Sequence, residues 1–148
     1  MDPDPHREAP LGRVLLDVGN KVSRSFDAAL ARAGGSRSKW QILLALKQRP
    51  KANQREIASA VGIQEATLTH HLAGMEASGL IVRRRDPDNR RVHLIELTRS
   101  GEDAFLRLRE AALAFDQCFR SGIPEAEIDQ LRATVDKLMA NLDREDET

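Results

Sequence analysis

The chain has 148 residues, of which 41% are hydrophobic and 31% charged, a length and composition typical of one modest globular domain. No apolar run approaches the ~20 residues that a membrane-spanning helix needs, and the N-terminus lacks the basic and apolar regions of a secretory signal. Cys118 is the only cysteine, which excludes an intrachain disulfide. We therefore expect a cytoplasmic protein with no membrane partner.

The charges are segregated along the chain, although the formal net charge is zero. Residues 37–100 carry twelve basic and six acidic side chains, a net charge of +6. Residues 101–148 carry six basic and twelve acidic side chains, a net charge of −6. This pattern predicts that one face of the molecule meets a polyanion and that another face does not.

Apolar residues recur at helical spacing through most of the chain. In chain order, helices are expected over about 11–33, 36–46, 53–60, 64–78, 99–120 and 124–142, with a β-hairpin over 83–97. A short helix, a glycine turn, a second helix and a hairpin together form a winged helix-turn-helix. The expected fold class is therefore mainly α with a small β-hairpin wing.

Several residues mark the expected ends of these helices. Ser36 or Ser38 can cap the second helix, and Asn53 has the spacing of a capping box with Glu56. Pro124 suits the first turn of the last helix. The helix boundaries are thus predicted by local chemistry as well as by periodicity.

The hairpin holds five arginines in nine residues, from Arg83 to Arg91, around a Pro-Asp-Asn turn. A solvated, charged hairpin is one interpretation. Fixed positive charge at this density, however, needs a polyanionic partner, and the phosphates of DNA are the usual one.

The helix expected over 64–78 has two unlike faces. Leu68, Leu72 and Met75 form the side that should be buried. The opposite face is small and uncharged, whereas a helix exposed only to water normally carries Lys and Glu there. Such a face can enter the ~12 Å major groove, where Thr and His can bond base edges and methyl groups can contact thymine. The alternative is a helix that packs against another protein surface.

The chain from about Leu11 to Leu142 resembles the MarR family of bacterial transcription regulators. The motifs that carry this resemblance are Ala66-Thr67-Leu68-Thr69, Leu72, Glu76, Gly79-Leu80-Ile81, Arg84, Asp86-Pro87-Asp88-Asn89-Arg90-Arg91 and Leu97-Thr98-Arg99-Ser100-Gly101. The resemblance implies a homodimer of winged helix-turn-helix lobes, in which the fourth helix reads the major groove. It also implies that the wing enters the flanking minor groove, with Arg91 in the position of the family's minor-groove arginine.

The resemblance also suggests how the chain is organised. Residues 1–10 would be a disordered tail, and 11–148 one MarR-like domain. Within that domain, 11–35 and 99–142 would be dimerisation helices, and 36–98 the DNA-binding lobe. The chain departs from the family pattern at two positions: Asn89 replaces an Asp that often pairs with a wing arginine, and His70 replaces a common arginine.

The expected partners are a second copy of the chain, double-stranded DNA with a pseudo-palindromic operator, and a small-molecule effector that releases a repressor from that operator. The residues expected at DNA are Asn53, Gln54, Gln64, Ala66, Thr67, Thr69, His70, Arg83, Arg84, Arg85, Asn89, Arg90 and Arg91. As in the family, Phe26, Trp40 and Leu44 are candidates for the effector pocket, although core packing explains them equally well.

No catalytic or phosphate-loop motif occurs, so we expect neither an enzyme nor a cofactor. The four histidines do not form a set with the spacing of a metal site. Cys118 is expected to be a buried, inert thiol between Phe115 and Phe119. A redox- or metal-sensing regulator of the same fold and a non-specific architectural DNA-binding protein remain the alternatives.

Overall fold

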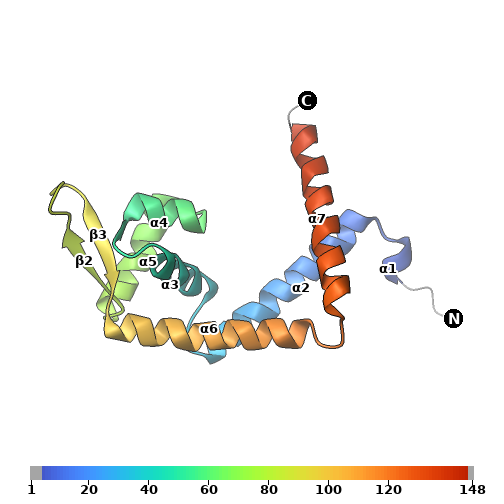
Figure 1. Cartoon of the computed structure of the whole chain (residues 1–148), viewed down its shortest axis with the longest axis horizontal. Helices are drawn as coiled ribbons and strands as arrows, with labels where there is room; N and C mark the ends of the chain where they lie inside the picture. The colour runs from blue at the N-terminus through green and yellow to red at the C-terminus, as the bar shows by residue number, and fades with distance from the viewer. Residues whose placement is uncertain (1–4, 147–148) are drawn as a thin grey trace. The chain divides into compact units, whose positions relative to one another are not determined.

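The computed structural model describes residues 5–146. Its elements are α1 (Pro5–Glu8), α2 (Leu11–Arg32), α3 (Arg37–Gln48), β1 (Ala52–Asn53), α4 (Gln54–Val61), α5 (Glu65–Ala77), β2 (Ile81–Arg85), β3 (His93–Leu97), α6 (Arg99–Phe119) and α7 (Glu125–Asp146). Helices α3, α4 and α5 lie together beside the β2–β3 hairpin (Figure 1). The predicted fold class, mainly α with a small wing, is confirmed.

The chain divides into two compact units, Met1–Leu113 and Ala114–Thr148, with the boundary inside α6. The expected organisation of 11–148 as one MarR-like domain, with a DNA-binding lobe and dimerisation helices, stays a prediction. Part of the tail that was expected to be disordered, Pro5–Glu8, forms the short helix α1, and residues 1–4 lie outside the described residues.

Polar caps fix the ends of α3, α4 and α5. Ser36, rather than Ser38, caps α3, and its side chain accepts a hydrogen bond from Lys39 N at 3.2 Å. The Asn53 side chain accepts from Glu56 N at 2.9 Å while Glu56 Oε2 accepts from Asn53 N at 3.3 Å, which confirms the capping box. Gly79, with φ of 74°, follows α5 in the left-handed conformation that favours glycine.

The small sheet has the order β1-β3-β2, with both pairs antiparallel. Sequence analysis missed β1, because two residues show no periodicity and pair only with a distant strand. In the register of the hairpin, Ile81 lies opposite Leu97 and Arg83 opposite Ile95. Since alternate residues share a face, buried Ile81 and Ile95 show that this face is turned to the core.

The core of the first unit joins the expected apolar faces. It includes Leu30, Ile42, Leu43, Leu46, Ile57, Leu68, Leu72, Ile81, Ile95 and Leu108, all of them buried. Trp40 stacks on Phe105 with ring centroids 5.6 Å apart, and Lys47 Nζ lies 5.5 Å from the centre of the Phe105 ring. Lys47 also pairs with Glu102 at 2.9 Å. The start of α6 is thereby held against α3.

A close backbone contact lies at the base of the wing. A Cβ added at Gly101 would stand 2.1 Å from the Leu80 carbonyl oxygen. Beside it, the Thr98 hydroxyl donates to Gly79 O at 2.5 Å and accepts from Gly101 N at 3.1 Å. The Thr-Arg-Ser-Gly motif therefore packs the first turn of α6 onto the segment that begins β2.

In the second unit, Arg120 joins the end of α6 to the start of α7. Its side chain contacts Asp116 at 3.3 Å and Glu125 at 2.5 Å, and these two carboxylates raise the pKa of Arg120. Pro124 stands just before α7, where its carbonyl accepts from Glu127 N and Ile128 N. This differs from the expected place in the first turn.

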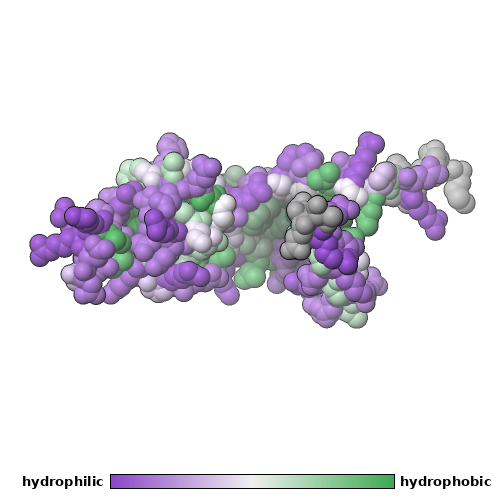
Figure 2. Space-filling view, turned by 90° about the horizontal axis from the view of Figure 1, so that it is seen from above, coloured by the Kyte–Doolittle hydropathy of each residue, from purple (hydrophilic) through white to green (hydrophobic). Residues whose placement is uncertain are grey.

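Apolar side chains lie open to solvent on the long helices. They include Leu11, Leu15, Leu16 and Val18 on α2, Leu106, Leu113 and Phe119 on α6, and Leu131, Val135, Met139 and Leu142 on α7. Figure 2 shows hydrophobic residues at the surface where α2 and α6 lie, whereas the wing end is mostly hydrophilic. None of the helices within residues 5–146 has the length and apolar character needed to cross a membrane.

Cys118 corrects one expectation. The thiol was expected to be buried between Phe115 and Phe119, but it is exposed. Phe115 and Phe119 stack on each other, with centroids 5.9 Å apart. Apolar neighbours in sequence therefore did not predict burial of the cysteine between them.

Candidate nucleic-acid interface

Helix α5 is anchored by one face and presents the other to solvent. Leu68 and Leu72 have no exposed surface, and Met75 is 4% exposed. The residues of the opposite face are all exposed: Ala66, Thr67, Thr69, His70, Ala73, Gly74 and Ala77. Gln64, the residue before the helix, is exposed as well and makes no capping bond. The structure thus confirms a small, uncharged face on a rigid helix, a shape that fits the major groove.

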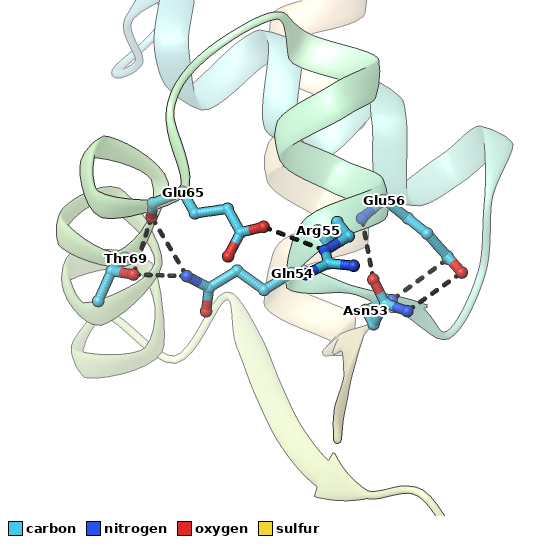
Figure 3. A network of polar contacts seen from close by, with 6 residues as sticks. All are labelled: Asn53, Gln54, Arg55, Glu56, Glu65 and Thr69. Carbon is cyan, nitrogen blue, oxygen red and sulfur yellow. Dashed lines mark hydrogen bonds and ion pairs between the residues drawn. The ribbon is translucent and has the colours of Figure 1, made fainter. Parts of the chain in front are cut away.

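The first turn of α5 is fastened to α4 by side chains (Figure 3). Gln54 Nε2 donates to Thr69 Oγ1 at 2.5 Å and to the Glu65 carbonyl at 3.2 Å. The Thr69 hydroxyl donates to the same carbonyl at 2.9 Å. Arg55 Nε lies 3.4 Å from Glu65 Oε1, an exposed ion pair of small energy. Polar side chains therefore fix the angle at which α5 leaves the turn.

The Asn53 side chain makes the expected capping contacts, and its contact with DNA stays a prediction. Its Oδ1 accepts from Glu56 N, and its Nδ2 donates to Glu56 Oε1 at 3.2 Å. Both polar atoms of this side chain are thus engaged in capping α4. Arg55 and Glu65 were missed by sequence analysis, because their pairing depends on how α4 packs against α5.

The wing arginines fall into two groups. Arg83 Nε lies 2.8 Å from Glu76 Oε2 of α5, as a charge contact without hydrogen-bond alignment. Arg84 Nε lies 3.1 Å from Glu96 Oε2 of the neighbouring strand. The remaining three, Arg85, Arg90 and Arg91, are exposed, and within residues 5–146 they have no ion-pair partner. Two arginines hold the wing in place, and three present free positive charge.

The tip of the wing is closed by short side-chain bonds. Asp86 Oδ1 accepts from Asp88 N at 2.9 Å, and Asn89 Oδ1 accepts from Arg91 N at 3.3 Å. Between the ends of β2 and β3 and the turn, Asp86 N donates a further hydrogen bond across the hairpin to Val92 O at 2.9 Å. An amide oxygen suffices for the bond at Asn89, so the tip keeps its turn while it lacks one negative charge.

A hollow of about 530 Å³ lies between α4, the start of α5 and the wing. Its lining brings together residues from all three elements: Asn53, Gln54, Arg55, Glu65, Arg83, Arg91, Val92, His93 and Ile95. A second hollow, of about 270 Å³, lies beside α5 and includes Ser36, Lys39, His70 and His71. Sequence analysis had not assigned Lys39, His71 or His93 to the DNA surface.

The other candidate sites lie elsewhere. Phe26, Trp40 and Leu44 are partly buried and pack against the core of the first unit, so an effector pocket at these residues stays a prediction. Across residues 5–146, no group of three or more His, Cys, Asp or Glu side chains could hold a metal ion.

Known proteins resemble both the sequence and the fold. The model of the MarR family matches residues 36–93. Over 96 residues the chain is 30% identical to the uncharacterized HTH-type transcriptional regulator YdgJ of Bacillus subtilis (strain 168). That match covers 65% of this chain and 57% of YdgJ, so the chain spans little more than half the length of this relative.

Solved structures extend the likeness over most of the chain. The transcriptional repressor CouR, bound to a 23-mer DNA duplex, has a TM-score of 0.80 and 25% identity, and the match covers 94% of this chain and 99% of that one. CouR from Rhodococcus jostii RHA1 bound to p-coumaroyl-CoA has a TM-score of 0.73 and 25% identity, with 92% and 95% covered. Residues 36–93, which span α3, α4, α5 and the hairpin as far as the start of β3, thus form a MarR-family domain, and the solved structures show the same fold over most of the chain.

Proposed function

We propose that this protein is a DNA-binding transcription regulator, in which α5 enters the major groove and the wing contacts the flanking minor groove. The observation that carries the proposal is that one lobe presents both an uncharged face of small residues on α5 and three exposed wing arginines, Arg85, Arg90 and Arg91. Within residues 5–146 these arginines have no ion-pair partner. Close approach and long-range attraction are the two requirements of sequence-specific binding. The likeness to CouR, which was solved bound to a DNA duplex, supports binding to DNA.

The binding form in this proposal is a homodimer. Leu16 on α2 is 70% exposed and Leu142 on α7 is 58% exposed, and each belongs to a wider set of apolar side chains on its helix. A second copy that covers these faces removes that apolar surface from water. Sedimentation at micromolar concentration should show a dimer, and a monomer alone would contradict this part of the proposal.

The proposed regulator is a repressor released by a small-molecule effector. CouR, which the chain resembles, is called a repressor, and it has been solved with p-coumaroyl-CoA. For this chain, the pocket would lie near Phe26, Trp40 and Leu44. Release of the bound duplex by a small molecule, with no response to chelators or peroxide, supports this reading over a metal or redox sensor. Because Cys118 is exposed, peroxide can reach its thiol, so a lack of response to peroxide argues against a redox sensor.

Selection of binding sites from random-sequence duplexes tests the proposed function. A two-fold dimer with two recognition helices should enrich a pseudo-palindrome whose half-site centres lie about one helical turn apart. Competition with random DNA at fixed salt should then leave the selected duplex bound. Equal affinity for selected and random duplexes would indicate an architectural protein instead, and a single asymmetric half-site would contradict the symmetric dimer.

A further inference from the structure

We infer that Thr69 reads DNA through its methyl group rather than its hydroxyl, that the base it reads is thymine, and that Gln54 is the residue that positions it. The inference rests on the proposed function, because it requires the exposed face of α5 to lie in the major groove. Sequence analysis allowed Thr69 either kind of contact.

The hydrogen-bonding capacity of the Thr69 hydroxyl is mostly used inside the protein. A hydroxyl has one proton to donate and two lone pairs that accept. The Thr69 proton goes to the Glu65 carbonyl at 2.9 Å, and one lone pair accepts from Gln54 Nε2 at 2.5 Å. No donor remains for the acceptor atoms of a base edge.

The Gln54 amide is likewise committed. Because the Glu65 carbonyl can only accept, the amide nitrogen of Gln54 must face it, at 3.2 Å. Its two N–H groups then serve Glu65 and Thr69, which leaves only the acceptor Oε1 of Gln54. The paired bond of Gln to adenine needs a donor and an acceptor together, so Gln54 cannot read adenine in this arrangement. Gln54 therefore acts through Thr69.

With its oxygen held, the Thr69 side chain can offer DNA its methyl group. The oxygen and the methyl carbon occupy separate tetrahedral positions on Cβ, so fixing the oxygen fixes the methyl as well. The residue is exposed, and Ala66 and Ala73, about one helical turn before and after it, are also exposed, small and apolar. In the major groove, the thymine C5-methyl is the apolar group that distinguishes one base from the others.

The experiment uses the duplex that the wild-type protein selects from random sequence. Each thymine is replaced in turn by uracil, which removes only the C5-methyl. At one thymine per half-site, wild-type affinity should fall about fourfold, the effect expected for one buried methyl group. Thr69→Val carries methyl groups at both positions that the Thr69 oxygen and methyl occupy, so it keeps the methyl without needing the Gln54 bond and should show the same loss. Thr69→Ser keeps the hydroxyl and should bind thymine and uracil equally at that position.

Two further results decide the inference. Gln54→Ala should reduce the fourfold difference between thymine and uracil, while thermal unfolding confirms that the variant stays folded. The methyl contact would be contradicted if the affinity difference between thymine and uracil persists in Thr69→Ser, or if the wild type shows no such difference at any thymine. The positioning role of Gln54 would be contradicted if the difference is unchanged in Gln54→Ala. Failure of the proposed function looks different, because then no sequence is selected above random.

Discussion

Helix α5 and the wing are neighbours in one lobe, but they are held in place in opposite ways. Buried leucines lock α5 into the core, and its outer face is uncharged. The wing extends from the core on two strands, braced by the Arg83–Glu76 and Arg84–Glu96 ion pairs. Groups fixed by packing can discriminate among bases, because their positions are set before binding. Charges on long side chains attract any duplex, because they adapt to it.

Removing the anchor of α5 should have the largest effect. Leu72→Ala deletes a side chain with no exposed surface and should destabilise the lobe by about 2–5 kcal/mol, the range for cavities in protein cores. Urea denaturation measures this loss. Thr67→Ala, on the exposed face of the same helix, should change stability by less than about 0.5 kcal/mol. Similar losses in the two variants would contradict the anchoring described for α5.

The base of the wing should tolerate change poorly as well. Gly101→Ala forces a methyl group toward the Leu80 carbonyl, only 2.1 Å from the ideal Cβ position. Overpacking of this kind typically costs about 1–3 kcal/mol. Gly74→Ala is the matched control, because nothing lies within 4 Å of its added Cβ. That change should stabilise α5 by up to about 1 kcal/mol. If Gly101→Ala and Gly74→Ala change the melting temperature by the same amount, the contact at Gly101 is not tight.

Binding separates the two regions more directly. Arg91→Ala should weaken binding to selected and random duplexes alike, and should flatten the plot of log affinity against log salt by about 1. His70→Ala should instead alter preference among bases on the selected duplex, with little change on random DNA. Titrations at several salt concentrations give both quantities. If the two variants lose the same affinity on both duplexes, the division between helix and wing is wrong.

The smallest effect distinguishes paired from unpaired arginines. Arg85→Ala removes a guanidinium with no acidic partner within residues 5–146, and it should reduce the salt dependence of binding. Arg83→Ala removes a charge already matched by Glu76 at 2.8 Å, so its effect on the salt dependence should be smaller. A larger slope change in Arg83→Ala than in Arg85→Ala would mean that DNA recruits Arg83 away from Glu76.

Local chemistry explains which parts of the fold could be predicted. Ser36, Asn53 with Glu56, and Gly79 mark helix ends by contacts within a few residues, so these ends could be read from sequence. Strand β1 exists only because it pairs with β3, and a two-residue strand leaves no pattern to detect.

The candidate site was harder to predict, because its contacts join separate elements. The exposed face of α5 followed from helical periodicity alone. The hydrogen bond from Gln54 to Thr69 and the ion pair of Arg83 with Glu76 depend on tertiary packing, so sequence analysis predicted DNA contacts for Gln54, Thr69 and Arg83 but not their contacts inside the protein. The exposure of Cys118 was missed for a related reason, because burial depends on what packs over α6.

The Arg83–Glu76 ion pair has a kinetic consequence. A phosphate that approaches Arg83 competes with a carboxylate already 2.8 Å away, so part of the wing's charge is withheld from random DNA. Weaker attraction to non-specific sites means shorter stays at each one, and a regulator must test a very large number of such sites to find its operator. In the proposed regulator, holding Arg83 against α5 would lower the affinity for random DNA and shorten the search for the operator.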